Sequence, residues 1–406
     1  MFTSFFVGAA LANGQTTHMW ISHEALEVLP EGDLKSFLEQ PEHLAALENG
    51  TMFPDGGYAV GHPYGETAHW EPFQGLFRDW ILDNYQGPED PAAGRDVAFY
   101  LGMASHGMAD QVFDALYMER SKQKDAAFGW STGESLDTSS DIVWAWETGS
   151  QVPPEAWVPP IMKTLFAEVG IEIDDETLML GQERLGLAID FVGVSGQIES
   201  GVETHRAHFP WACNHLTDRS VPGGPYSEAE IIAHYWMDLW DELHGDSLDL
   251  EVLATFPGEG GREHHKASED VESRLTVVFN RSLLSREVQE ATVLLEGEGA
   301  VPVLDPWLFY RDDSHVLHLD PDVNWSDNTD YTVTLKEGIE GTDGRALQSD
   351  FVLNFSTKPF EDPRQNTDPC TCSSHSGARV AWAWLAAVAV WRRRARPGPK
   401  RSPHLG

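Results

Sequence analysis

The chain has 406 residues, enough for two domains of ordinary size. It carries 65 acidic and 27 basic residues, a formal net charge of −38, and a surface of that sign repels nucleic acid backbones. The three cysteines, Cys213, Cys370 and Cys372, are too few for a disulfide scaffold.

The first twelve residues, MFTSFFVGAALA, read as a short secretory signal that ends in the small-x-small site Ala10-Leu11-Ala12. Cleavage there would leave Asn13 as the mature N-terminus. The apolar run is short and no basic residue precedes it, so an ordinary buried first helix is the alternative. We expect export of the mature chain on this basis.

The next two segments carry candidate ligands. THMWISHEALEVL predicts an amphipathic helix with His18 at its start. The following stretch, TMFPDGGYAVGHPYGETAHWEPF, predicts a loop because proline and paired glycines interrupt it, and it holds Asp55 and His69. Loops of this kind often place functional groups on a rigid scaffold.

Residues 96–120 predict a long helix that carries His106, Asp110 and Asp114, each four residues after the last. Side chains at this spacing lie on one face. Carboxylates buried on an apolar helix need a partner or a cation, whereas a solvated polar face is the simpler alternative. GESLDTSSDIVW then repeats the spacing with Asp137 and Asp141.

Four pieces carry a family resemblance: THMWISHEALEVL, MFPDGGY, ETAHWEPF and VAFYLGMASHGMAD, in that order. They resemble the zinc-dependent phospholipase C family, most closely the branch that contains the N-terminal domain of glycosylphosphatidylinositol-specific phospholipase D. They cover roughly residues 13–146, which correspond to the metal-binding half of an all-helical domain. The resemblance implies a cluster of zinc ions.

The resemblance also implies the ligands of a zinc pair. The mature N-terminal residue, Asn13, is expected to chelate one zinc through its amine and carbonyl oxygen, together with His18. A second zinc is expected to take His69 and His106. Asp110 would bridge the two metals. Imidazole nitrogen and carboxylate oxygen are the usual zinc ligands in catalytic sites.

By the same resemblance, Asp55 is expected to be a ligand or a base beside the attacking water. The family holds a third zinc with two histidines and an acidic residue. Asp114, Asp137 and Asp141 stand at the matching places here, although Leu136 fits the family position given to Asp137 equally well. A site made only of carboxylates suits a harder divalent cation better than zinc.

The predicted fold class is multidomain, with an all-α zinc phospholipase C-like domain over residues 13–262 and a small Ig-like β-sandwich over 263–358. Residues 160–169 and 177–198 predict helices, and a capping box at 227–230 predicts the start of another. RLTVVFN, ATVLLEG, HVLHLDP, DYTVTLKEG and FVLNFST predict short strands, and their order resembles a bacterial Ig-like module.

A linker with Cys370 and Cys372 is expected at 359–378. The tail, 379–406, joins an apolar run to Arg392-Arg393-Arg394 and resembles the C-terminal sorting tags of myxobacterial surface proteins. The cysteines would then be processing or lipidation sites. The apolar run is shorter than a bilayer span, so a buried or interfacial helix is the alternative.

These features predict an exported, metal-dependent phosphodiester hydrolase of phospholipase C/D type, anchored at the cell surface. Two zinc ions would activate water against a phospholipid or glycosyl-phosphoinositide-like substrate at a membrane surface. Export and sorting machinery are the expected partners, and nucleic acid is not. The alternatives are a surface adhesin or binding protein with a structural metal site, and a single-strand nuclease on the same scaffold.

Overall fold

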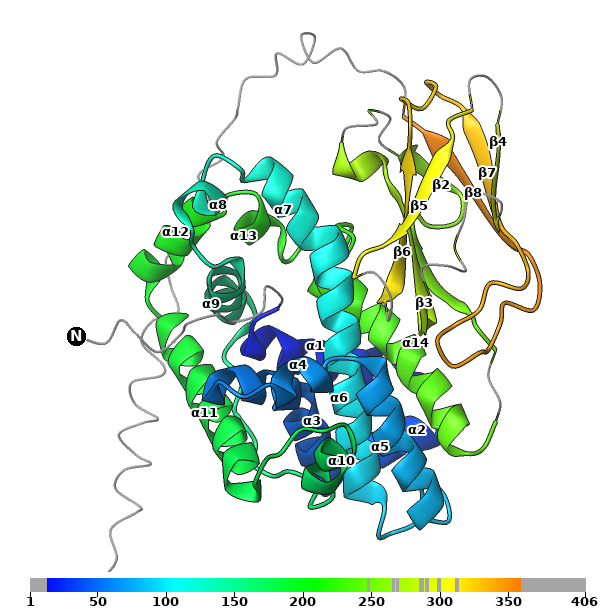
Figure 1. The fold of residues 1–406 in the computed structure, drawn as a ribbon. Coiled ribbons are helices and arrows are strands. Elements are labelled where there is room, and N and C mark those ends of the chain that lie inside the picture. The colour runs from blue at the N-terminus through cyan, green and yellow to red at the C-terminus, as the bar shows by residue number, and fades with distance from the viewer. Residues whose placement is uncertain are drawn as a thin grey trace, which may run out of the picture. The chain divides into compact units, whose positions relative to one another are not determined.

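The computed structural model describes residues 13–358 except for gaps at 247–248, 265–266, 268–269, 285–287, 289–291, 298–300 and 311–313. The predicted signal peptide (1–12), linker with Cys370 and Cys372 (359–378) and sorting tail (379–406) lie outside the described residues. Within them, no helix combines the length and the apolar character needed to cross a membrane. Helices occupy the first part and strands the second, which confirms the predicted fold class (Figure 1).

The helical region contains α-helices and one π-helical segment, η1. Their bounds are α1 (Gln15–Val28), α2 (Asp33–Leu38), α3 (Pro41–Val60), α4 (Tyr64–Ala68), α5 (Glu71–Asn84), α6 (Gly94–Val112), η1 (Phe113–Met118), α7 (Glu119–Lys124), α8 (Gly129–Thr132), α9 (Leu136–Thr148), α10 (Met162–Glu168), α11 (Asp175–Ser195), α12 (Glu199–His208), α13 (Ala212–His215) and α14 (Pro225–Leu243).

The predicted helix at 96–120 is confirmed as the continuous run α6–η1–α7, and α6 lies at the centre of the helical region (Figure 1). Nearly all of α6 is buried. It packs closely on α3 because glycines stand at the crossing: a Cβ on Gly102 would lie 2.1 Å from the Leu47 carbonyl oxygen. Such contact between two backbones brings side chains of both helices to one place.

The predicted loop at 51–73 is wrong. Helix α3 continues through Pro54 to Val60, and α4 follows after a short turn. The glycines that suggested turns serve close packing instead, since a Cβ on Gly56 would lie 2.5 Å from the Tyr64 hydroxyl and one on Gly57 would lie 2.1 Å from the Gly65 nitrogen. Tertiary packing therefore overrides the local turn signal.

The predicted helices at 160–169 and 177–198 are confirmed as α10 and α11, with ends shifted by one to three residues. The capping box at 227–230 is wrong, because α14 begins at Pro225 and no side chain caps it. The helical region ends at Leu243 and β1 begins at Val252, so the expected domain boundary at residue 262 falls inside strand β2.

The β region has two four-stranded sheets around a shared apolar core. The strands are β1 (Val252–Phe256), β2 (Gly261–His264), β3 (Leu275–Leu283), β4 (Val293–Gly297), β5 (Leu304–Leu308), β6 (Ser314–Pro321), β7 (Asp330–Leu335) and β8 (Phe351–Thr357), with a short 3-10 turn η2 (Val271–Ser273). The sheet orders are β1-β3-β6-β5 and β2-β8-β7-β4, antiparallel except for the parallel pair β2–β8.

The five predicted strands are confirmed as β3, β4, β6, β7 and β8, whereas β1, β2 and β5 escaped prediction. All three lie at sheet edges. Edge strands are paired on one side only and tolerate proline, as Pro306 in β5 illustrates.

The β-sandwich packs against the helical region through α6 and α14. Val278 of β3 and Val316 of β6 belong to the same apolar core as α6. The side-chain oxygen of Gln111 accepts a hydrogen bond of 2.8 Å from the His315 backbone N–H. Glu71 accepts one of 2.7 Å from the Ser282 N–H. The two regions thus share a buried interface.

Candidate metal centre

Two histidines face each other at the centre of the helical region. His106 lies on α6 and His69 directly follows α4, and their Nε2 atoms are 3.0 Å apart. The Nδ1 atom of His106 lies 2.7 Å from the Thr51 carbonyl oxygen, and that of His69 lies 2.6 Å from the Gly65 carbonyl oxygen. A carbonyl only accepts, so each Nδ1 donates, and the two Nε2 atoms are left facing each other, where they can share a proton or bind a metal ion. That arrangement calls for a cation between them.

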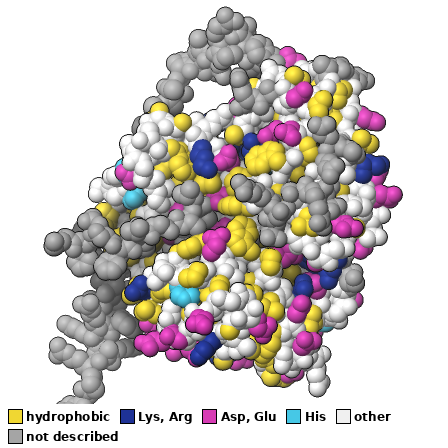
Figure 2. Space-filling view, viewed as in Figure 1, with side chains coloured by type: hydrophobic (Ala, Val, Ile, Leu, Met, Phe, Trp, Pro, Cys, Tyr) yellow, Lys and Arg dark blue, Asp and Glu magenta, His cyan; other side chains and the backbone are white. Residues whose placement is uncertain are grey.

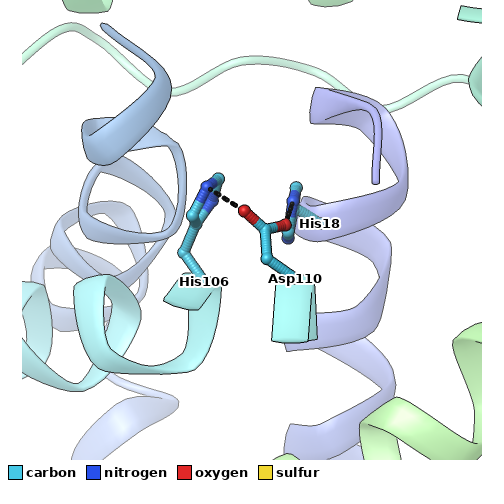
Figure 3. A group of neighbouring side chains, drawn as sticks. All are labelled: His18, His106 and Asp110. Atoms are coloured by element: carbon cyan, nitrogen blue, oxygen red, sulfur yellow. Dashed lines mark ion pairs between the residues drawn. The ribbon is translucent and has the colours of Figure 1, made fainter. Parts of the chain in front are cut away.

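The carboxylate of Asp110 links this pair to a third histidine, His18, and Figure 3 shows Asp110 between His106 and His18. Its Oδ2 lies 3.4 Å and 3.3 Å from the Nε2 atoms of His69 and His106. Its Oδ1 lies 2.9 Å from Nε2 of His18, which comes from the first turn of α1. Asp110 therefore spans two groups of nitrogen donors, as the predicted bridging role requires.

Asp55 completes the second group from α3. Its Oδ1 is 3.4 Å from Nε2 of His69 and 3.8 Å from Nε2 of His106. The structure thus forms two clusters of donor atoms that share His106: one with His18 and Asp110, the other with Asp55 and His69. Zinc bonds of about 2.0–2.2 Å in tetrahedral geometry separate neighbouring donor atoms by about 3.3 Å, close to the spacings here.

The electrostatics of the cluster favour one positive charge. Burial lowers the pKa of His69, but hydrogen bonds to Asp110 and Asp55 outweigh it and raise that pKa to about 10. Burial and the neighbouring His18 lower the pKa of His106. Burial disfavours the charged Asp110, yet the histidines hold its pKa well below the ordinary value. The site is built to hold an anionic carboxylate beside a cation.

Buried polar atoms without a hydrogen-bond partner gather at the same place. Among the described residues they include Oδ1 of Asn13, Oδ1 of Asp114 and Oε1 of Glu228, and Nε2 of His18 and Oδ1 of Asp110 have no partner besides their 2.9 Å contact with each other. Buried polar groups are normally satisfied, so a cluster of unsatisfied ones needs an explanation. Imidazole nitrogens and carboxylate oxygens are the donor set of zinc, and these residues fit it.

The residues predicted for a third metal do not form a third cluster of this kind among the described residues. Asp141 is turned toward the start of α1, where its Oδ1 accepts a 2.7 Å hydrogen bond from the Thr17 N–H and its Oδ2 one of 3.2 Å from the Thr16 N–H. It caps a helix whose own cap residue, Gly14, has no side chain. Asp114 lies on η1, where a π-turn departs from regular four-residue alignment.

Asp114 and Asp137 are both buried, and burial together with Asp110 and Asp137 raises the pKa of Asp114 well above its ordinary value. Two neighbouring acids of this kind resist carrying two charges. A third site resting on Asp114 and Asp137 stays a prediction.

Sequence reasoning missed two side chains at the centre. Glu228, assigned to a capping box, is fully buried, and its carboxylate accepts a hydrogen bond from the Asn13 side-chain amide. Burial, Asp110 and Asp114 raise the pKa of Glu228 well above its ordinary value. Tyr310, from the β-sandwich, donates its hydroxyl to Asp114. Neither is recognisable in the sequence, because each reaches the site only through tertiary packing.

A cavity of about 420 Å³ opens beside the cluster. Its walls are aromatic and acidic with one lysine, and they come from both regions of the chain. The lining residues are Tyr58, Glu66, His69, Trp70, Gly107, Asp110, Gln111, Asp114, Met118, Lys122, Phe309 and Tyr310. This volume lies within the range of small-ligand pockets, roughly 300–1,000 Å³.

Comparison with known proteins agrees with this geometry. Residues 17–113 match the family model described as zinc dependent phospholipase C. The chain is also similar to phosphatidylinositol-glycan-specific phospholipase D of Rattus norvegicus (29% identical over 175 residues, 40% of this chain and 21% of that protein) and of Bos taurus (33% over 115 residues, 26% and 14%). The Homo sapiens protein is 28% identical over 166 residues, 37% of this chain and 20% of that protein.

The chain thus spans about a fifth or less of the length of these relatives. Among solved structures, the S-layer protein rSbsC(31-844) aligns with 80% of this chain and 46% of that chain at 10% identity and a TM-score of 0.22, too low to indicate a shared fold. Residues 246–357 match the model of a bacterial Ig-like domain. The chain therefore carries a zinc dependent phospholipase C domain, matched over residues 17–113, followed by a bacterial Ig-like domain, matched over residues 246–357.

Proposed function

We propose that this protein is a zinc-dependent phosphodiester hydrolase that acts on a phospholipid or a glycosylphosphatidylinositol-like substrate. One observation carries the proposal: the Nε2 atoms of His69 and His106 face each other at 3.0 Å, with the carboxylates of Asp55 and Asp110 beside them. The match to the zinc dependent phospholipase C model supports the metal and the lipid substrate class. We propose two zinc ions bridged by Asp110, because its Oδ1 faces His18 while its Oδ2 faces His69 and His106.

The zinc ions would polarise the phosphodiester and lower the pKa of water at the site. The chain's own residues supply the orientation. The carbonyl oxygens of Thr51 and Gly65 fix both imidazoles so that Nε2 points into the site. The side chain of Asp55 is 21% exposed, against 9% for Asp110, so Asp55 is the acid placed to accept a proton from the attacking water.

The walls of the cavity place aromatic side chains beside this centre. Tyr58 donates a 2.6 Å hydrogen bond to Glu66, which also accepts one of 3.0 Å from the Trp70 indole. Burial and Glu66 raise the pKa of Tyr58, so its phenol stays protonated at neutral pH. A phosphodiester next to the histidines would lie against these rings.

The test is metal content by mass spectrometry on the full chain, with lipid hydrolysis assayed before and after chelation. We expect two zinc ions and chelator-sensitive cleavage. Phosphatidic acid as product would establish D-type cleavage, as the names of the relatives suggest, and diacylglycerol would establish C-type cleavage. A protein that holds zinc but cleaves no phosphodiester would instead fit the surface-binding alternative, and one that cleaves only single-stranded DNA would fit the nuclease.

We also propose that the protein is exported and held at the cell surface. The N-terminal MFTSFFVGAALA and the C-terminal apolar and arginine-rich tail support this. Cell fractionation, with mass determination of the mature N-terminus, tests it. Recovery of the chain in the cytoplasm with Met1 still attached would contradict export.

A further inference from the structure

The cavity beside the metal centre is built from two domains. Most of its lining belongs to the helical region, but Phe309 and Tyr310 follow β5 of the Ig-like domain. These two side chains contact the helical region and line the cavity at the same time. The Ig-like domain is therefore placed to influence what enters the cavity.

Tyr310 makes the decisive contacts. Its hydroxyl donates to Oδ2 of Asp114, four residues beyond the bridging Asp110. Its ring packs edge-on against that of Trp70, with a centroid distance of 5.1 Å and an interplanar angle of 70°. Trp70 directly follows the candidate ligand His69 in the chain. Phe309 in turn packs edge-on against Tyr310 at 4.7 Å. The two rings thus form one side of the cavity. Tyr310 hydrogen-bonds to Asp114 and packs against Trp70, so this side is in contact with the metal-binding region.

Buried contacts hold this wall in place. Gln111 lies next to Asp110 on α6 and accepts hydrogen bonds from the His315 N–H at 2.8 Å and the Ser314 hydroxyl at 3.3 Å. Val316 packs into the core of the helical region. Since α6 carries the candidate ligands His106 and Asp110 as well as Gln111, the same helix fixes the position of Tyr310 relative to this part of the metal centre.

We propose that the Ig-like domain is part of the substrate site, and that Tyr310 with Phe309 limits the size of the phosphate-linked head group that reaches the metal centre. This rests on the proposed function. The alternative role for Tyr310 is interface stabilisation alone, which predicts a change in unfolding temperature without a change in selectivity. Tyr310 is a specificity-determining residue, and it takes no part in bond making.

The test compares Tyr310→Ala with the wild type on zinc-loaded full-length protein. Calorimetry gives the dissociation constants of inorganic phosphate and of inositol 1-phosphate, and kinetics gives kcat/KM for lipids with an ethanolamine or a glycosylated inositol head group. Two ratios are compared: the affinity for inositol 1-phosphate over that for inorganic phosphate, and kcat/KM for the glycosylated inositol lipid over that for the ethanolamine lipid. We expect Tyr310→Ala to raise both ratios by about tenfold or more. Lys336→Ala, which removes an exposed pair within the β-sandwich outside the cavity lining, should leave both ratios unchanged.

An unchanged ratio in a Tyr310→Ala protein that keeps its zinc and its unfolding temperature would overturn the proposal. If Tyr310→Ala loses zinc or fails to fold, Phe309→Ala shortens the same wall while keeping the hydrogen bond to Asp114, and the same outcomes apply. If Tyr310→Ala changes the relative affinity for the two phosphates but neither protein hydrolyses lipid, the role of Tyr310 in the cavity would stand and the proposed function would be rejected. Failure of the inference can thus be told apart from failure of the proposed function.

Discussion

At the scale of single residues, the site depends on which nitrogen of each histidine carries the proton. The carbonyl oxygens of Thr51 and Gly65 accept from Nδ1 of His106 and His69, and this leaves both Nε2 atoms to a cation. Backbone carbonyls commonly orient metal-binding histidines in this way. Asp110 then joins these histidines to His18, so one carboxylate decides whether the two clusters act as a unit.

Asp110→Asn should release both zinc ions and lower hydrolysis by more than about 100-fold, since even residues that only orient metal ligands cost 10–100-fold when removed. Metal analysis and an activity assay on the purified variant measure this. Asp190→Asn changes an exposed aspartate on α11 and should behave as wild type. Retention of two zinc ions by Asp110→Asn would show that this carboxylate is not the bridge.

Zinc binding should release a proton near neutral pH. Without metal the pKa of His69 is raised to about 10, so at pH 7 the ring is protonated and zinc must displace that proton. Affinity should therefore fall about tenfold for each unit by which the pH drops below 10. Calorimetry in buffers of different ionisation enthalpy counts the released proton, and a pH-independent affinity between pH 6 and 8 would contradict the expectation.

At the scale of helices, close packing and capping position the ligands. Helices α3 and α6 touch at Gly50 and Gly102, where a Cβ would lie 2.1 Å from the Phe99 and the Leu47 carbonyl oxygen respectively. This crossing brings Asp55 of α3 to the histidines. The carboxylate of Asp141 caps the N-terminus of helix α1, which carries His18, by accepting a hydrogen bond from the Thr17 N–H. The positions of Asp55 and His18 thus depend on the glycine contacts and on Asp141, none of which would touch the metal.

Gly102→Ala should destabilise the fold by about 2–3 kcal/mol, because the added methyl group forces two backbones apart. Zinc affinity should fall with it. Gly75→Ala on α5 is the matched control: its nearest neighbour would be the Arg78 guanidinium at 3.7 Å, so helix propensity should make it neutral or up to about 1 kcal/mol stabilising. Denaturant titration of both variants gives the comparison.

Asp141→Ala should lower stability by about 3 kcal/mol, since it leaves two buried backbone N–H groups and the Thr17 hydroxyl without an acceptor. Ser135→Ala removes an ordinary cap from α9 and should cost about 1 kcal/mol. Zinc stoichiometry is the discriminating readout. Loss of one metal ion from Asp141→Ala, with the others retained, would restore Asp141 as a ligand of a third site.

At the scale of the whole molecule, a buried charge cluster joins the two domains. Glu242 of α14 is 4% exposed and pairs with Arg78 at 3.0 Å, Arg281 at 3.1 Å and Arg345 at 2.7 Å. Arg281 and Arg345 belong to the β region, so one carboxylate links both domains.

Acidic side chains are also spread widely over the face in Figure 2, as the net charge of −38 requires. That field attracts divalent cations and repels anionic surfaces.

Glu242→Ala should destabilise the docked protein by about 3 kcal/mol, because the buried guanidinium of Arg281 then keeps only Asp343, at 3.4 Å, as a carboxylate partner. Calorimetry should then show separate unfolding of the helical and β regions. Lys336→Ala removes a pair with Asp350 that is exposed and lies within the β-sandwich, so it should cost less than about 1 kcal/mol. A single unchanged transition in Glu242→Ala would argue against this link.

The sequence by itself determined the fold class, the central helix that carries His106, Asp110 and Asp114, and the five strands with a strong alternating pattern. These features depend on periodicity, which is local. Only the tertiary structure decided that Asp55 lies on a helix, that Asp141 caps α1, and that Glu228 and Tyr310 reach the site. Glycines that permit backbone contact look like turn residues in sequence, and contacts between positions far apart leave no periodic trace. The residue types of the metal centre were therefore readable from the sequence, whereas its surroundings were not.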